Sequence, residues 1–413
     1  MRILKGRAAE QAVRNLERRR SRLASVEPSV RKIIAAVRHD GDKAVLAYAT
    51  KWDSLATNQA LRVSPEEIEA AWSQTPRPLR LALKQAAANI RRFCKWQMPR
   101  ERRRKIDGGE LGQLLRPISS VACYVPGGRY PLPSTLLMTA IPAQVAGVRR
   151  IVVTSPRPQP ATLAAAALLG ISEVYRCGGT QAIAMLAYGT ETVSPVEKIV
   201  GPGNSYVAAA KMLVSFDCAI DMFAGPTEAV VFCDDGEITF LASDIVAQAE
   251  HDPDAVVVHI TLKRHIAEEM RDFVKLLSRD NPIARQAIHN NGYGLVALSR
   301  QQAMDWVNRL APEHLTIAER DLGEVQNAGS VFVGDYSPQS AGDYAAGPNH
   351  VLPTAGAARV RGGLSVNDFL KIITVQNFSR QGLQRIAPTI TTLAEAEGLV
   401  AHAQSVRLRC GNA

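Results

Sequence analysis

The feature that most constrains the fold is an alternation of short apolar segments with alanine-rich stretches between residues 117 and 226. Four apolar segments have the length of β-strands, and each runs into glycine or small polar residues: 120–125, 150–154, 173–176 and 198–200. The stretches between them have the length and composition of helices. Strands that alternate with helices predict a parallel, doubly wound sheet, which binds ligands at the carboxyl ends of its strands.

A second unit of the same kind follows. Apolar segments at 229–233, 255–260, 294–298 and 330–333 indicate strands, and residues 238–250 between the first two indicate a helix. Residues 1 to about 105 have the periodicity of helices, and the chain returns to helix at 368–377 and 393–406. The chain is therefore expected to be an α/β protein with helical segments at both ends.

Composition excludes several classes of protein. An apolar share of 46% with 21% charged residues excludes wholesale disorder, and no apolar run reaches the ~18–20 residues of a transmembrane helix. The N-terminus lacks the apolar core of a signal peptide. The six cysteines form no C-x-x-C pair, which argues against a zinc knuckle or a disulfide framework. We expect a cytoplasmic location.

Positive charge gathers in the first part of the chain. Residues 1–116 contain 26 basic and 12 acidic side chains, a net charge of +14, and the other residues carry −4 of the total of +10. The densest runs are Arg18–Arg20 and Arg102–Lys105. Such runs contact nucleic acid or an anionic cofactor in some proteins and are solvated helix faces in many more. A basic, nucleic-acid-binding protein on an inactive enzyme scaffold therefore stays an alternative.

Polar clusters at the predicted element ends carry the chemistry. Gln248 and His251 are three residues apart, so they share one face of a helix. Glu313 and His314 are adjacent and offer two proton-transfer groups of different basicity. The usual G-x-G-x-x-G loop for dinucleotides is absent, and residues 201–204 are the nearest approach to it.

Further polar residues lie toward the C-terminus. Asp343 and His350 belong to a stretch, 340–350, that is too rich in glycine and polar residues to predict a helix. Glu397 and His402 are five residues apart, about 140° around an ideal helix, so they need not converge. Spacing alone does not assign a function to any of these clusters.

The predicted element ends carry distinctive stretches, which are Tyr124–Gly128, Gly178–Ala184, Lys198–Asn204, Ile220–Glu228, Ser243–His251, Pro312–Leu315, Ser340–Tyr344 and Gly347–Thr354. Taken together and in order, these stretches resemble the histidinol dehydrogenase family over nearly the whole chain. The resemblance implies a zinc-dependent, NAD-linked oxidation of L-histidinol to L-histidine through histidinaldehyde, the final step of histidine biosynthesis.

The resemblance also implies roles for individual residues. Zinc would be held by Gln248, His251, Asp343 and His402. His314 would be the base for the alcohol, and Glu313 would activate the water that hydrates the aldehyde. Substrate-contacting positions, ligands and base included, are Thr227, Gln248, His251, His314, Asp343, His350, Glu397 and His402. NAD-contacting positions are Tyr124, Gln181 and Asn204.

We predict two incomplete Rossmann-like α/β domains with small helical terminal extensions. The boundaries are an N-terminal helical arm (1–21), a substrate and metal domain (22–121 with 227–364), an NAD domain (122–226) and a C-terminal helical tail (365–413). The resemblance further implies a homodimer in which the tail completes the neighbour's site, with no nucleic acid or membrane partner. A related zinc and NAD dehydrogenase for another amino alcohol or diol is the alternative, because the turn at Arg129-Tyr130 differs from the family's usual small residues.

Overall fold

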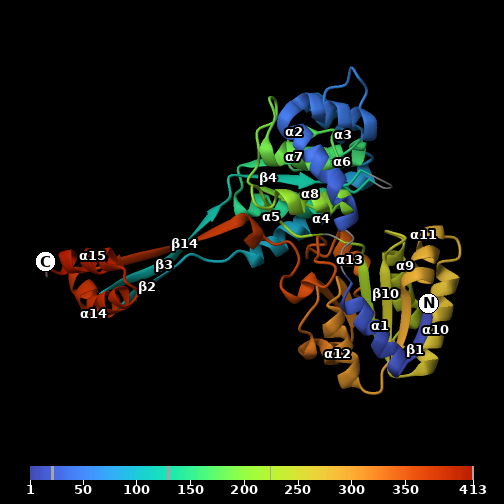
Figure 1. The fold of residues 1–413 in the computed structure, drawn as a ribbon. Helices are drawn as coiled ribbons and strands as arrows, with labels where there is room; N and C mark the ends of the chain where they lie inside the picture. The colour runs from blue at the N-terminus through green and yellow to red at the C-terminus, as the bar shows by residue number, and fades with distance from the viewer. Residues whose placement is uncertain (20–22, 128–130, 224, 412–413) are drawn as a thin grey trace.

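The computed structural model describes residues 1–19, 23–127, 131–223 and 225–411. The chain forms two α/β lobes and a long arm that projects from one of them (Figure 1). We call the lobe built on residues 120–220 lobe I and the lobe built on residues 228–333 lobe II. The predicted α/β class is confirmed. Within the described residues, no helix is both long and apolar enough to cross a bilayer.

Lobe I is built on a parallel sheet with the strand order β6-β5-β4-β7-β8. Its strands are β4 (Ser120–Tyr124), β5 (Arg150–Thr154), β6 (Val174–Tyr175), β7 (Lys198–Val200) and β8 (Ala219–Ile220). They are joined by α5 (Pro133–Ala146), α6 (Pro160–Leu168), α7 (Gly179–Tyr188) and α8 (Ser205–Val214). The order reverses between β4 and β7, so the carboxyl ends of these two strands form the place where such sheets bind ligands.

Lobe II repeats this strand order and adds one strand. Its parallel sheet has the order β1-β11-β10-β9-β12-β13. The strands are β1 (Arg2–Lys5), β9 (Glu228–Phe232), β10 (Val256–Thr261), β11 (Gly292–Val296), β12 (His314–Ile317) and β13 (Ser330–Val333). The helices are α1 (Arg7–Glu17), α9 (Ile238–Ala249), α10 (Arg264–Leu277), α11 (Pro282–Asn291), α12 (Arg300–Leu310), η1 (Glu319–Glu324) and α13 (Gln339–Tyr344).

The N-terminal part of the domain prediction is wrong in two respects. Residues 1–21 are not purely helical, because β1 pairs with β11 at the edge of the lobe II sheet before α1 begins. The helices α2 (Leu23–Trp52), α3 (Pro65–Gln74) and α4 (Arg77–Gln97) belong to lobe I rather than to the domain of 227–364.

The hydrophobic cores show how these helices are placed. Val45 of α2 shares a core with Ile183 of α7, and Ile90 of α4 shares another with Leu136 of α5. The helical periodicity identifies which side chains are buried, but it carries no information about the sheet that receives them.

The arm is formed by segments from both halves of the chain. Strands β2 (Arg102–Ile106), β3 (Gly109–Pro117) and β14 (Leu370–Phe378) make an antiparallel sheet, and α14 (Arg380–Ala396) and α15 (Val400–Cys410) follow at its tip. The predicted helix at 368–377 is therefore wrong, apart from the short turn η3 (Val366–Phe369). Residues 370–378 are rich in β-branched side chains, which favour strand, and they pair with β3 along its whole length.

Candidate active site between the two lobes

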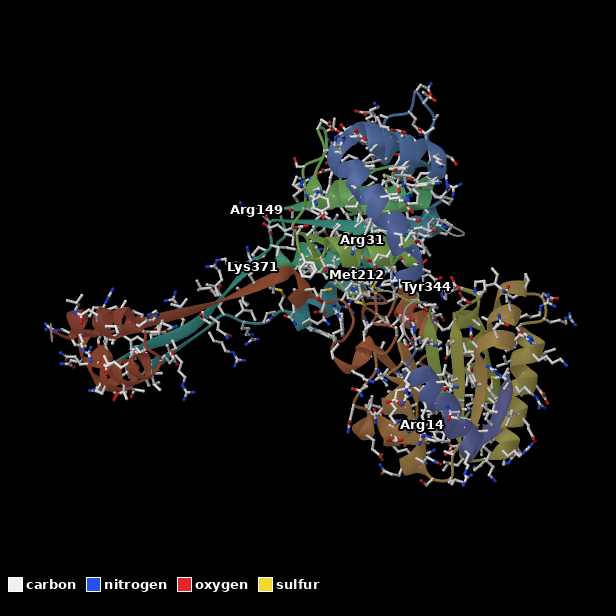
Figure 2. All side chains as sticks on the ribbon, viewed as in Figure 1. Arg14, Arg31, Arg149, Met212, Tyr344 and Lys371 are labelled. Carbon is white, nitrogen blue, oxygen red and sulfur yellow. The ribbon has the colours of Figure 1, made fainter. Side chains whose placement is uncertain are left out.

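The predicted catalytic residues lie at the amino edge of the lobe II sheet. Thr227 directly precedes β9, Glu313 directly precedes β12, and His314 is the first residue of β12. The segment after β13 carries α13 to the junction of the two lobes, where Tyr344 lies in Figure 2. The site therefore combines the amino ends of the lobe II strands with residues that face lobe I.

His314 is buried between two carboxylates. Its Nδ1 lies 3.7 Å from Oε2 of Glu313, and its Nε2 lies 3.5 Å from Oδ1 of Asp343. The imidazole stacks on Phe332 with 5.9 Å between ring centres. Neither ring nitrogen has a hydrogen-bond partner in the part of the chain that the structure describes. The ring is thus fixed in place while both nitrogens stay available.

Burial tunes the acid–base properties of this pair. Burial raises the pKa of the Glu313 carboxyl to about 7, although His314 and the N–H of Glu228, which donates to Glu313 Oε2 at 3.0 Å, oppose that rise. For His314, burial favours the neutral ring, but the carboxylates of Glu313 and Asp343 outweigh it and raise the pKa of the imidazole. The pKa of Glu313 therefore lies near neutral pH, the range that suits a group that transfers protons in catalysis.

The structure brings together three of the four predicted metal ligands. Gln248 is buried in the last turn of α9, and its Nε2 donates to Oδ2 of Asp343 at 3.1 Å. His251 follows the end of α9 with its side chain exposed. The pKa of Asp343 is lowered: burial opposes the charge, but His314, His350 and His251 favour it. Asp343 is thus an ionised carboxylate, the form that binds metal.

Asp343 is held by a helix that the sequence did not predict. Residues 339–344 form α13, although glycine and polar residues suggested a loop. The helix is fastened at its start, where the N–H of Gln339 donates to Oδ1 of Asp244 at 3.3 Å and Gln339 Nε2 donates to Thr316 Oγ1 at 3.0 Å. Asp244 lies one turn before Gln248 on α9, so it ties the two ligand-bearing helices together.

The fourth predicted ligand lies elsewhere. His402, in α15, and Glu397, at the end of α14, are exposed at the tip of the arm, far from α9 and α13 (Figure 1). Among the described residues, no three His, Cys, Asp or Glu side chains gather in a group that could hold a metal. One amide, one imidazole and one carboxylate fit zinc, which prefers four ligands of these kinds, but they leave the set incomplete.

His350 joins the site to lobe I. Its Nδ1 lies 2.7 Å from the backbone oxygen of Asp343, and its Nε2 lies 3.4 Å from Oγ1 of Thr135 in α5. Burial lowers the pKa of its imidazole, although Asp343 works in the opposite direction. His350 is therefore a neutral ring that spans the two lobes beside the predicted ligands.

The three predicted NAD-contacting residues lie at the carboxyl edge of the lobe I sheet. Tyr124 ends β4, and its buried hydroxyl oxygen accepts the N–H of Gly179 at 3.1 Å. Gln181 is buried in α7 and donates from Nε2 to Asp53 at 3.0 Å. Asn204 is exposed and caps α8 by accepting the N–H groups of Tyr206 and Val207. Tyr124 and Asn204 flank the point where the strand order reverses.

Sequence reasoning missed the groups that support this edge. Asp53, at the end of α2, accepts the N–H of Gly178 at 2.9 Å. Lys211 and Asp221 form a buried ion pair that holds both backbone groups of Gly201: Asp221 accepts its N–H, and Lys211 donates to its carbonyl oxygen. Asp221 lies within a matching stretch of the sequence, but no spacing rule linked it to Lys211, ten residues earlier.

Comparison with known proteins decides the family. The family model for histidinol dehydrogenase matches residues 16–410. The chain is 45% identical to the histidinol dehydrogenase of Methanothermobacter thermautotrophicus over 409 residues, which are 95% of this chain and 96% of the relative. It is also 45% identical to that of Aliivibrio fischeri over 400 residues, 94% of this chain and 90% of the relative. The chain belongs to the histidinol dehydrogenase family.

The fold comparison agrees with the sequence comparison. The crystal structure of histidinol dehydrogenase from Elizabethkingia anophelis matches with a TM-score of 0.94 and 36% identity, covering 99% of this chain and 98% of that one. The predicted membership of the histidinol dehydrogenase family is confirmed, and the chain is an oxidoreductase of that family.

Proposed function

We propose that this protein oxidises L-histidinol to L-histidine through L-histidinaldehyde, with NAD and zinc, as the final step of histidine biosynthesis. The observation that carries the proposal is His314, buried between the carboxylates of Glu313 and Asp343, with Gln248 bonded to Asp343. This arrangement supplies a base, a second proton-transfer group and part of a metal site within a few ångströms. Family membership supports the choice of substrate.

His314 and Glu313 divide the proton transfers. In the first step His314 accepts the proton of the substrate hydroxyl through one of its unpartnered nitrogens while the carbon loses a hydride. In the second step Glu313 takes a proton from the water that adds to the aldehyde, because a carboxyl with a pKa of about 7 accepts a proton from a polarised water more readily than an ordinary carboxylate does.

Four side chains would hold zinc: Gln248, His251, Asp343 and a His402 supplied by a second chain. When bound, zinc would hold the amino and imidazole nitrogens of the substrate, and NAD would accept one hydride in each step. Asp244 fixes the spacing between Gln248 and Asp343 by tying α9 to α13. The amide of Gln248 donates to Asp343 and so keeps its oxygen for the metal.

The remaining predicted contacts belong to the same proposal. Thr227, His350 and the partner's Glu397 would contact the substrate, where a carboxylate suits the cationic histidinol. Tyr124, Gln181 and Asn204 would contact NAD. The side chains of Tyr124 and Gln181 are buried, where they bond to Gly179 and Asp53 beside the loop after β6. Of the three, Asn204 alone has an exposed side chain.

We further propose a homodimer in which each tail completes the neighbour's site. His402 and Glu397 are exposed on an arm that extends away from both lobes of its own chain. The arm also exposes apolar side chains on its strands and helices, such as Leu111, Ile372, Leu393 and Leu408. Large apolar side chains on a projecting element call for a partner surface, and a two-fold mate would receive both arms equivalently.

The activity is tested by following NADH production from L-histidinol. The proposal predicts turnover that a chelator abolishes and that added zinc restores. Activity on another amino alcohol or on a diol, with none on histidinol, would instead favour the related dehydrogenase. The turn at Arg129-Tyr130 that raised this alternative lies outside the described residues. All six cysteines are free, in keeping with the cytoplasmic location that we propose.

Sharing of sites is tested by complementation between two inactive chains. A His402→Ala chain mixed with a His314→Ala chain should recover activity, because a heterodimer holds one doubly damaged site and one intact site. The expected recovery is up to half the wild-type activity per heterodimer. A heterodimer that forms, as judged by two different affinity tags, but has no activity would mean that each chain builds its own site.

A further inference from the structure

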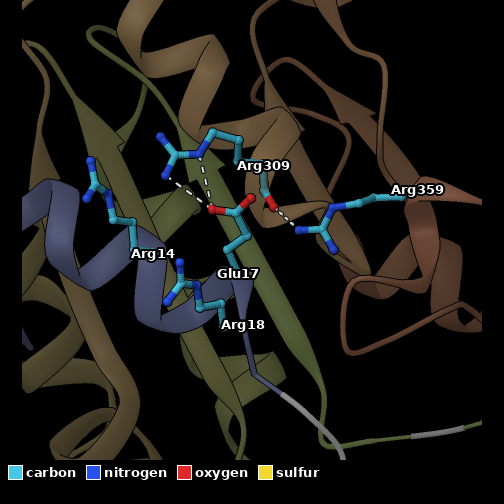
Figure 3. A pocket seen from close by; sticks show the side chains of 5 residues that line it. All are labelled: Arg14, Glu17, Arg18, Arg309 and Arg359. Carbon is cyan, nitrogen blue, oxygen red and sulfur yellow. Dashed lines mark hydrogen bonds and ion pairs between the residues drawn. The ribbon is translucent and has the colours of Figure 1, made fainter.

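A cluster of arginines at the end of α1 borders two adjoining open hollows that the proposed reaction does not use. The first has a volume of about 560 Å³ and is lined by Arg14, Glu17, Arg18, Arg309 and Arg359 (Figure 3). The second has a volume of about 690 Å³ and is lined by Glu17, Arg18, Arg19 and Ala355. They share Glu17 and Arg18, so we treat them as one arginine pocket.

Within the part of the chain that the structure describes, two of these arginines make no ion pair with a carboxylate. Arg309 pairs with Glu17, with Glu10 and with Asp305. Arg359, in contrast, donates to the backbone oxygens of Gly356 and Arg309 and makes no ion pair within the described residues. Its charge is nevertheless near enough to Glu228 to favour the ionised form of that carboxyl. Among the described residues, the Arg18 side chain makes no ion pair or hydrogen bond. Arg18 and Arg359 therefore face the pocket without a directly paired carboxylate.

The wall of the pocket beside these charges is fixed. Arg14 pairs with Glu10 one helical turn earlier. Arg19 forms an ion pair through Nη2 with the buried carboxylate of Glu228, which also accepts the N–H of Ala355 at 2.8 Å. The other terminal nitrogen of Arg19, Nη1, is buried without a hydrogen-bond partner in the described part of the chain. The fork of Arg19 is thus held in place with one donor unused.

We propose that the arginine pocket binds a phosphate dianion, either free phosphate or the phosphate group of a small metabolite. Phosphate and its monoesters carry a charge of about −1.5 to −2 near neutral pH, and two guanidinium groups without a directly paired carboxylate can each donate to their oxygens. Guanidinium is planar and always charged, and it binds phosphate oxygens through two parallel N–H groups. This proposal assigns roles to two residues of the basic run Arg18–Arg20. Arg19 fixes the wall of the pocket through its ion pair with Glu228, and Arg18 faces the ligand.

The pocket is separate from the proposed catalytic residues but has one neighbour in common with them. Glu228, which Arg19 holds, donates its backbone N–H to Glu313. The candidate NAD residues lie on lobe I, at the end of a different sheet. A phosphate bound to the arginine pocket is therefore a ligand in addition to the cofactor.

The test is calorimetric titration of the full chain at constant ionic strength with inorganic phosphate and, separately, with ribose 5-phosphate. Saturable binding to one site per chain is expected. Arg18→Gln and Arg359→Gln should each weaken binding by about ten- to a hundredfold, because each removes a charge-assisted hydrogen bond. Arg279→Gln is the matched control, since Arg279 is exposed in lobe II and lines neither hollow. Circular dichroism confirms that the variants fold.

Each outcome bears on the proposal. Tighter binding of ribose 5-phosphate identifies a metabolite as the ligand, and equal or weaker binding identifies free phosphate. The absence of saturable binding would overturn the proposal, as would equal affinities for Arg18→Gln and Arg279→Gln. A DNA duplex that binds in a manner sensitive to Arg18→Gln, when neither small phosphate binds, would make the pocket a nucleic-acid contact and refute the small-anion site.

Discussion

The buried ion pair between Lys211 and Asp221 allows a sharp test of what holds the loop after β7. Lys211→Met keeps the length of the side chain but leaves the Asp221 carboxylate, which has no exposed surface, without a counter-charge. Removal of one partner from such a pair costs about 3–5 kcal/mol. The carbonyl of Gly201 loses its donor as well. We therefore expect a loss of about 4 kcal/mol in the free energy of unfolding, a large part of a typical domain's stability.

The assay is urea unfolding followed by circular dichroism, with two matched variants. Lys211→Met combined with Asp221→Asn removes both charges and keeps an oxygen that accepts a backbone N–H, so it should regain about half of the loss. Lys275→Met, at an exposed lysine of α10, should change stability by less than about 0.5 kcal/mol. A double variant as unstable as the sum of its single changes would refute the reasoning. In the Lys211→Met variant, the KM for NAD should rise more than the KM for histidinol. The reason is that the ion pair holds Gly201, in the same loop as Asn204, which we propose to contact NAD.

Three other predictions concern the active site and the core. Glu313→Gln should impair oxidation of histidinaldehyde more than that of histidinol, and His314→Ala should slow the alcohol step by about 10²–10⁴-fold; separate assays of the two substrates check this. Asp244→Ala should weaken zinc binding by about ten- to a hundredfold in chelator competition, whereas Asp244→Asn, which can still accept from α13, should lose less. Burial lowers the pKa of His259 to about 4, so only the unfolded chain takes up this proton as pH falls from 6.5 toward 4. Stability should fall by about 2 kcal/mol between pH 7 and pH 5, and His259→Gln should flatten that slope in urea unfolding.

The sequence predicts four strands of the lobe I sheet because each of them is a short segment that ends at glycine or a small polar residue, but it does not predict the two-residue strand β8. These signals are local, and the four predicted strands coincide with β4 to β7. The attachment of α2 to α4 could not be predicted in the same way. The apolar stripe of each of these helices could pack on the sheet of lobe I or on that of lobe II. Which sheet receives it depends on how the complete surfaces of helix and sheet fit together.

The site shows the same division between local and long-range information. Glu313 and His314 are neighbours in the sequence, so their proximity was expected. The placement of Asp343 against His314 depends on α13, whose start is fixed by Asp244 from a distant segment. The sequence predicts helix rather than strand for β14 because its apolar residues suit both periods and its partner β3 lies far away in the chain.

The position of β1 has a consequence for how the protein is made. Strand β1 pairs with β11, and the whole sheet of lobe I is encoded between these two strands. On the ribosome, the sheet of lobe I is complete when residue 220 has emerged, although Phe369 joins its core later, whereas β1 must wait until residue 296 follows. Closing so long a loop slows folding more than it lowers stability. We therefore expect a nascent chain to carry the sheet of lobe I and an unpaired β1 for several seconds. Until β1 returns, the edge of β11 is open to pairing with other chains.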